Sequence, residues 1–452
     1  MSKFSKSDKW YFGVFTLVLL MSFAFNAFGT VTTNGFLLNY KSSEALVVNQ
    51  VHCQGELYSG QLINVRGGYN PKTAKDYCAR EELVPYSSQF GLQGRLHTST
   101  YNALDRVADL EVKTFVGLAK IFAFLSSAVT FALLAMYVKK NIGTTESIFV
   151  VLGIAMSPMI VGFSGNLFWA VPTMFAPLLY VLYFYKSQFV RNKAILFWSG
   201  AFVLLYIRYL NGYEYVSAFT IMVAAAVAYV SYLSKQNMKE YIKQFALVFV
   251  VSLFAFIAAF GTHIYGLNQH TGSTRLSVDL IKKRANDRLG NTEAYLRFPY
   301  SNFSNHHNEL YRVGNYYFDF DSQKENSTET GAYAVALTDY ALLPVIKLPL
   351  NLSRPFADIV QSFAFFIIVM TIMYRKRKKW VPRASLRQVE AAFLAGGLGA
   401  LSIISWMVLA RSHSLVHSHI NGIMLYYPFG IFAFIIFGSY ARFAFKRYTR
   451  KK

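Results

Sequence analysis

The chain has 452 residues, 54% apolar and 17% aromatic, and its mean hydropathy is +0.30. This composition excludes an ordinary soluble domain and is typical of a protein that crosses a membrane many times. The net charge of +22 would suit a nucleic-acid-binding protein, but the basic residues gather in short loops between apolar segments, so we expect no nucleic acid among the partners.

About ten apolar segments approach the roughly 20 residues that a helix needs to cross a bilayer, and we expect the shorter ones to extend into their flanks. In chain order these segments are Trp10–Gly29, Phe115–Tyr137, Ile148–Phe163, Leu167–Tyr185, Ala194–Ile207, Val216–Leu233, Phe245–Tyr265, Ile359–Met373, Ala391–Ala410 and Ile420–Tyr440.

Basic residues occupy every second gap between these segments, which is the pattern of cytoplasmic loops. The excess positive charge would face the anionic membrane lipids of the cytoplasmic leaflet. The pattern predicts that both termini are cytoplasmic and that two long loops, 31–113 and 269–354, lie on the other side. The basic groups are Lys3 to Lys9, Lys139 and Lys140, Lys186 to Lys193, Lys235 to Lys243, Arg375 to Arg387, and Arg442 to Lys452.

The predicted fold class is therefore an all-α polytopic membrane protein of about ten transmembrane helices, with two large ordered outer loops. We interpret the first apolar segment as a retained helix because no convincing cleavage site follows it. Five regions result: 1–30, the first helix; 31–113, the first outer loop; 114–268, helices two to seven; 269–354, the second outer loop; and 355–452, helices eight to ten with a basic tail.

Cys53 and Cys78 are the only cysteines, and both fall in the first outer loop. A pair of cysteines in an oxidising compartment suggests a disulfide, with two free thiols as the alternative.

Charged residues near the edge of a bilayer are costly unless they are paired or face water. Arg208 and Glu214 flank a tight hairpin between the fifth and sixth segments. They predict either a structural ion pair or a carboxylate that accepts a proton from a substrate hydroxyl. Asp105 and Asp109, on one face of a short helix before the second segment, are alternative bases.

Several polar groups on the outer side could contact a substrate. Gln89, Gln93 and Arg95 lie in a turn suited to sugar hydroxyls, although a structural turn is an equal alternative. Asn166, near Trp169, would line an outward-facing cavity with Glu214 at its floor, or these residues would anchor the chain at the membrane interface. Lys120, within the second segment, would either snorkel outward or meet an anionic substrate.

Two basic groups could contact a lipid phosphate. Arg411, His413, His417 and His419 lie in the last outer hairpin, where Arg offers a fork of donors to a phosphate. His413 and His417 share the i, i+4 spacing of zinc ligands, but no further ligand motif accompanies them. We expect no cofactor, and a divalent metal stays an open alternative. Lys283, Arg284 and Arg288 lie on a helix, Leu276–Leu289, that we predict at the outer membrane interface. These residues would either form a docking surface for a lipid phosphate or simply face the solvent.

The two outer loops and the short elements Asn211–Tyr215 and His417–Asn421 resemble those of the GT-C class of integral-membrane glycosyltransferases. In size and loop plan the chain is similar to the bacterial glucosyltransferases that modify O-antigen. The resemblance covers the architecture of the whole chain, and its motifs are short. GT-C enzymes often carry an acidic residue directly after the first span, whereas Gly29–Tyr40 contains none and Glu44 is the first. The order of candidate bases is therefore Glu214, then Asp105 or Asp109, then Glu44.

The resemblance implies an enzyme of the bacterial inner membrane with its active face in the periplasm. Such an enzyme moves a sugar from a polyprenyl-phosphate carrier to a glycan or glycolipid acceptor at the cell surface, such as lipopolysaccharide. A carboxylate activates the acceptor, and Arg, Lys or His stabilise the departing phosphate. The alternatives are a flippase for a lipid-linked glycan, although no internal repeat is visible, and a glycan polymerase or ligase.

Overall fold

The computed structural model describes residues 5–31, 41–53, 62–65, 83–189, 193–289, 345–347, 361–410 and 422–449. Most of the predicted second outer loop and part of the first lie outside these ranges.

The first helix, α1 (Lys6–Phe25), begins and ends at strong local signals. Ser5 and Asp8 form a capping box, in which each side chain bonds the backbone N–H of the other. Asn26 ends the helix in the left-handed conformation, at a φ of 50°.

The described part of the first outer loop contains two helices, α3 (Lys41–His52) and α4 (Leu92–Ala108). Between them, β1 (Ile63–Val65) pairs antiparallel with β2 (Leu83–Pro85). The all-α prediction missed this small sheet because three-residue strands carry almost no periodic signal. Gly91, at a φ of +72°, starts α4 where a Cβ would lie 2.6 Å from Leu62, so the turn requires glycine.

The chain then passes through α5 (Val112–Asn141), α6 (Thr144–Ala155), α7 (Pro158–Phe163), α8 (Val171–Phe184) and the short 3-10 helix η2 (Tyr185–Phe189). The predicted segment Ile148–Phe163 is thus two helices. The break occurs at Ser157, whose side chain caps α7, and at Pro158 in the first turn of α7, because proline lacks the N–H that would continue α6.

The next helices are α9 (Lys193–Asn211), α10 (Val216–Leu233), α11 (Met238–Thr271) and α12 (Thr274–Leu289). The 34 residues of α11 correspond to about 50 Å, more than the ~30 Å hydrocarbon core of a bilayer. Gly272, at a φ of +64°, ends α11.

After residues 345–347, the chain continues as α17 (Phe363–Trp380), α18 (Arg383–Leu409), the 3-10 helix η3 (Gly422–Tyr426) and α21 (Phe429–Thr449). Ser362 caps the start of α17. The last turn of α17 carries Arg377, Lys378 and Lys379.

Seven described helices are long and apolar enough to cross a membrane: α1, α5, α9, α10, α11, α18 and α21. The chain is therefore a helical polytopic membrane protein. Helices α6 to α8 and α17 cover the other three predicted segments, but they are shorter or more charged.

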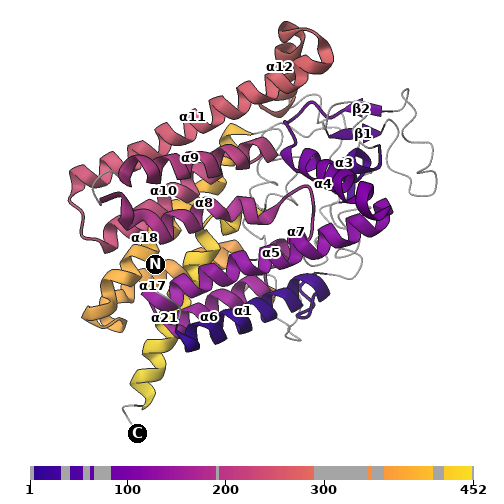
Figure 1. The fold of residues 1–452 in the computed structure, drawn as a ribbon. Helices are drawn as coiled ribbons and strands as arrows, with labels where there is room; N and C mark the ends of the chain where they lie inside the picture. The colour runs from indigo at the N-terminus through magenta and orange to yellow at the C-terminus, as the bar shows by residue number, and fades with distance from the viewer. Residues whose placement is uncertain are drawn as a thin grey trace, which may run out of the picture.

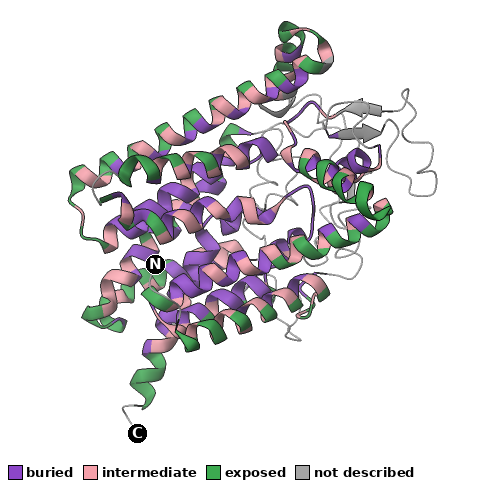
Figure 2. Ribbon diagram, viewed as in Figure 1, coloured by how far each residue is buried: buried purple, intermediate pink, exposed green. Residues whose placement is uncertain are grey.

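The helices pack as a bundle with α10 and α21 in its interior (Figure 1). Helix α10 packs along α18, α21 along α6, and α1 along α5. Buried residues occupy nearly every face of α10 and of α21 as far as Tyr440, whereas much of α11 is exposed (Figure 2). The exposed residues of α11 include several large apolar side chains, among them Phe254. An exposed apolar face of this kind suits contact with lipid.

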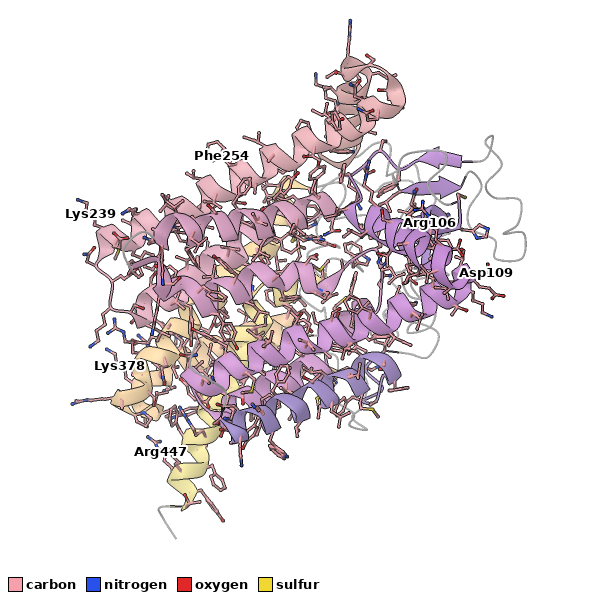
Figure 3. The ribbon with its side chains drawn as sticks, in the orientation of Figure 1. Arg106, Asp109, Lys239, Phe254, Lys378 and Arg447 are labelled. Atoms are coloured by element: carbon pink, nitrogen blue, oxygen red, sulfur yellow. The ribbon has the colours of Figure 1, made fainter. Side chains whose placement is uncertain are left out.

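The two ends of the bundle differ in charge. Lys239, Lys378 and Arg447 lie toward one end, called the basic end here, whereas Arg106 and Asp109 lie at the opposite end (Figure 3). This opposite end carries the predicted outer loop 31–113, and we call it the outer end for that reason. Helices α3 and α4 and the small sheet also lie at the outer end.

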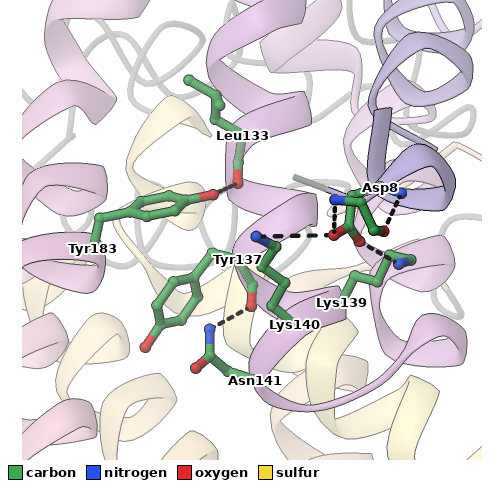
Figure 4. Close-up of polar contacts among 8 residues, drawn as sticks. Asp8, Leu133, Tyr137, Lys139, Lys140, Asn141 and Tyr183 are labelled. Atoms are coloured by element: carbon green, nitrogen blue, oxygen red, sulfur yellow. Dashed lines mark hydrogen bonds and ion pairs between the residues drawn. The ribbon is translucent and has the colours of Figure 1, made fainter. Parts of the chain in front are cut away.

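Ion pairs connect helices at the basic end. Asp8 of α1 contacts Lys139 at 2.8 Å and Lys140 at 3.9 Å, both on α5 (Figure 4). Glu146 of α6 is fully buried, pairs with Arg442 of α21 at 3.0 Å and accepts a hydrogen bond from Ser439.

Candidate functional site

The hairpin between α9 and α10 carries two buried charged side chains. Arg208 is 1% exposed and Glu214 is 4% exposed, and the two interact electrostatically. The Arg208 guanidinium also lies 4.6 Å from the centre of the Phe219 ring, a cation–π contact. Burial of a carboxylate at the outer end of a membrane bundle is costly, so the position needs a structural or a chemical reason.

Gly212 brings a carboxylate and an amide to one point of this hairpin. A Cβ at this residue would lie 2.4 Å from Oε2 of Glu214 and 2.6 Å from Oε1 of Gln89. Gln89 comes from the turn between β2 and α4, so the first outer loop reaches the predicted base. Both oxygens accept hydrogen bonds, so a hydrogen-bond donor is the group that suits a position beside them.

Gln93 joins this hairpin to a second one. Its Nε2 donates to the carbonyl of Phe168 and to the carbonyl of Asn211, both at 3.0 Å. One amide group on α4 therefore holds the α7–α8 hairpin beside the α9–α10 hairpin. Gln93 thus positions the Glu214 hairpin, while its own Oε1 has no hydrogen-bond partner.

The α7–α8 hairpin is organised by its own side chains. Oδ1 of Asn166 accepts hydrogen bonds from the backbone N–H groups of Phe168 and Trp169, which is the pattern of an Asx turn. Trp169 stacks on Tyr215, with ring centres 6.1 Å apart. Asn166 thus shapes the turn, and Trp169 packs against the hairpin that carries Glu214.

Arg95 faces the outer part of α11. Its guanidinium lies 4.2 Å from the centre of the Phe90 ring. A Cβ at Gly266 of α11 would lie 3.3 Å from Nη2 of Arg95 and 3.1 Å from Phe90. The close approach at Gly266 lets α4 pack on α11 as well as on the two hairpins.

We call the group of polar residues at this junction the outer polar cluster. Its members are Gln89, Gln93, Arg95, Asn166, Arg208 and Glu214.

Lys120 has a protein partner. Its Nζ lies 2.8 Å from Oε2 of Glu44 on α3, and Oε1 of Glu44 accepts a hydrogen bond from the backbone N–H of Leu167. This arrangement ties α3 to α5 and to the α7–α8 hairpin. These contacts give Lys120 and Glu44 a structural role as anchors between the three elements.

The other predicted carboxylates lie where α4 meets α5. Oδ1 of Asp105 accepts a hydrogen bond from the backbone N–H of Leu110. Asp109 is exposed, with a φ of 44°, at the outer corner of the molecule (Figure 3). Asp105 therefore stabilises the turn, and of the predicted bases Glu214 is the one placed against Gln89.

Several predicted site residues lie outside the described parts. They include Arg411, His413, His417 and His419 of the predicted last outer hairpin. The backbone of α12 includes Arg284 and Arg288, whose side chains are not described, and Lys283 is exposed there. Cys53 is disulfide-bonded, and the other cysteine of the chain, Cys78, lies outside the described residues.

A metal centre is not visible in the described ranges, where no group of three or more His, Cys, Asp or Glu side chains could hold an ion.

Two buried polar residues of α3 and α11 were not among the predicted site residues. His263 of α11 is 1% exposed, and its ring lies 5.6 Å from that of Tyr213. Burial, and then the nearby Glu214 carboxylate, raise the pKa of Tyr213. Gln50 of α3 lies beside α4, where a Cβ at Gly94 would be 3.7 Å from its Cγ. His263 could have been predicted, because a polar residue within an apolar span often has a function. The sequence around Gln50 has no feature that would distinguish it.

Comparison with models of protein families finds no match, and comparison with curated proteins finds none either.

Proposed function

We propose that this protein is a membrane glycosyltransferase of the GT-C type, with its active site at the outer polar cluster. All ten helical passes would cross the bacterial inner membrane, with both termini in the cytoplasm and the outer end in the periplasm. The donor would be a sugar linked to polyprenyl phosphate, and the acceptor a glycan or glycolipid such as lipopolysaccharide.

The observation that carries this proposal is the placement of Glu214. It is a buried carboxylate at the outer end of a membrane bundle, held beside Gln89 and an electrostatic partner, Arg208. A carboxylate with a neighbouring cation and amide can accept a proton from a hydroxyl and stabilise the resulting charges.

In the proposed reaction an acceptor hydroxyl oxygen bonds to the anomeric carbon of the donor sugar, and Glu214 takes the hydroxyl proton. The bond between the anomeric carbon and the phosphate oxygen breaks, and polyprenyl phosphate leaves with the electron pair. Arg208 would stabilise the developing charge. The phosphate would also contact the Arg411–His419 hairpin, and the basic helix α12 would dock the carrier.

Proteoliposomes test whether the protein makes a bond or moves a lipid. The purified protein is reconstituted with a lipid extract and a surface-glycan acceptor from the source cell. A transferase yields an acceptor heavier by one sugar and releases polyprenyl phosphate, whereas a flippase moves the lipid-linked sugar unchanged across the bilayer. Glu214→Gln is expected to lower transfer by roughly 10²- to 10⁴-fold, and Asp105→Asn serves as the matched carboxylate control. Movement without a new glycosidic bond would overturn the proposal.

A further inference from the structure

Two helices meet at the basic end with a surplus of positive charge. Helices α17 and α21 contain no Asp or Glu, and each carries basic residues in its last turn. Lys378 and Arg447 both lie toward the basic end (Figure 3). Like charges gathered in this way repel one another, so the surface favours an anionic partner. The exposed basic side chains of the two helix ends are those of Arg375, Lys376, Lys378, Lys379, Lys446 and Arg447.

Direct contacts hold the two helix ends against each other. Nη2 of Arg447 donates a hydrogen bond to the backbone carbonyl of Lys379 at 2.6 Å. The ring of Trp380 lies edge-on to the ring of Tyr440, with centres 5.7 Å apart. The Tyr440 hydroxyl also donates to the backbone carbonyl of Met373. The basic side chains of α17 therefore lie close to those of α21, on one surface.

This surface is not neutralised by carboxylates in the described part of the chain. Glu390 is the next acid along the chain after α17, and both of its oxygens have partners. Arg377 contacts one oxygen at 2.9 Å, and the Tyr232 hydroxyl donates to the other. Among the described residues, no carboxylate forms an ion pair with Lys378, Lys379, Lys446 or Arg447.

The same surface carries side chains that suit contact with a bilayer. Ile368 and Ile372 are exposed one helical turn apart on α17, and Lys376 continues the same face. Trp380 and Tyr448, which follow the basic residues of the two helices, are also exposed. Trp and Tyr concentrate where acyl chains meet headgroups. Apolar side chains followed by positive charge match the acyl chains and phosphate of a lipid better than they match a soluble acidic protein.

We infer that the adjoining ends of α17 and α21 bind the headgroup of a phospholipid with two phosphates, the cardiolipin class, in the leaflet at the basic end. Lysines from both helices can contact both phosphates of one such lipid. Arg447 bonds Lys379 through one nitrogen, and the remaining donors of its guanidinium suit a phosphate oxygen. Two linked phosphates bind more tightly than two separate ones, because the second contact is intramolecular. This lipid site does not depend on the proposed glycosyltransferase activity.

Native mass spectrometry of the purified protein in mild detergent measures the binding. Cardiolipin, phosphatidylglycerol and phosphatidylethanolamine are titrated separately into wild-type protein and into two triple variants. The site variant keeps Arg447, which joins the helices, and combines Lys378→Gln, Lys379→Gln and Lys446→Gln. The control variant removes the same charge from exposed lysines of η2, the α10–α11 loop and the first turn of α11, as Lys186→Gln, Lys235→Gln and Lys239→Gln. Thermal unfolding without added lipid reports on the fold.

Wild-type protein is expected to bind one cardiolipin at least roughly tenfold more tightly than phosphatidylglycerol, and phosphatidylethanolamine most weakly. Each lysine near an anionic headgroup contributes about a fivefold factor in affinity, so the site variant should bind cardiolipin roughly 100-fold more weakly. The control variant should bind it as wild-type protein does, and all three proteins should unfold at similar temperatures.

An equal loss of affinity in both variants would show that the whole basic end attracts lipid without a defined site, and it would overturn the inference. Equal affinity of wild-type protein for cardiolipin and phosphatidylglycerol would overturn it as well. This comparison of two lipids on wild-type protein decides the matter even if the site variant unfolds. Binding of a polyglutamate peptide without any binding of cardiolipin would point to an acidic protein partner instead.

Discussion

At Gly212 the backbone approaches the Glu214 carboxylate and the Gln89 amide so closely that a side chain has no room. We predict that Gly212→Ala lowers sugar transfer by tenfold or more, since a displacement of ~1 Å at a reacting group can cost about 100-fold. Unfolding temperature should barely change, because both obstructing atoms are the ends of flexible side chains. Gly397→Ala is the control, since a Cβ there meets nothing within 4 Å. Equal activity of the two variants would contradict the assignment of Glu214.

Glu146 is a second buried carboxylate among the described residues, and its role at the basic end is structural. We predict that Glu146→Gln destabilises the protein by about 1.5–3 kcal/mol, because Arg442, whose side chain is 20% exposed, would lose its charged partner. Thermal unfolding in detergent measures the loss. Lys243→Ala, which breaks an exposed pair with Glu240, should change stability by less than ~1 kcal/mol. Similar unfolding temperatures for both variants would show that the Glu146 pair contributes little.

Individual site residues were predictable where one local stretch contains the signal. The Arg208–Glu214 hairpin stood out because charges beside apolar segments are costly. The pairing of Glu44 with Lys120, 76 positions away along the chain, depends on tertiary packing that no local pattern contains. The same reason explains why Gln50 was missed, since its meeting with α4 arises only in the fold.

Helix α4 connects the first outer loop to three parts of the bundle, and one of its residues makes its stability depend on pH. Burial lowers the pKa of His97, so the folded state favours neutral imidazole. Below about pH 6.5 the unfolded chain binds this proton more readily. Stability should therefore fall as the pH drops from 6.5 toward the lower folded value, with no contribution above that range. Hydrogen exchange of α4 at pH 7.5 and pH 5 measures the change. His97→Phe, which keeps a ring against Phe115, should remove part of it, and identical pH profiles for both proteins would contradict this role.

Element boundaries followed their sequence signals unevenly. Ser157 and Pro158 are sequence signals for the break between α6 and α7. Our prediction used apolar composition alone and therefore gave one span over both helices. Helix α17 continues beyond the predicted Met373 into Arg377 and Lys379. A helix can continue past its apolar part through residues with long basic side chains. Hydropathy locates the end of the apolar part and not the end of such a helix.

At the scale of the whole molecule, the charge asymmetry predicts opposite sides of the membrane for the two ends of the bundle. Single cysteines at Asp109, Lys239 and Lys378 would test it, because all three residues are exposed and Cys53 is already disulfide-bonded. In intact cells, a membrane-impermeant thiol reagent should label Asp109→Cys alone. Lys239→Cys and Lys378→Cys should react only after the membrane is permeabilised. Labelling in the reverse order would invert the topology and place the outer polar cluster in the cytoplasm.

The central claim is that Glu214 drives the transfer of a sugar onto a surface glycan. The measurement that tests it most directly is the mass of the surface polysaccharide repeat in a deletion strain that carries wild-type protein, Glu214→Gln or no copy. The account predicts that the repeat loses one sugar mass both without the gene and with Glu214→Gln, while the variant accumulates normally in the membrane. A repeat of unchanged mass in all three strains, or full modification by Glu214→Gln, would contradict it.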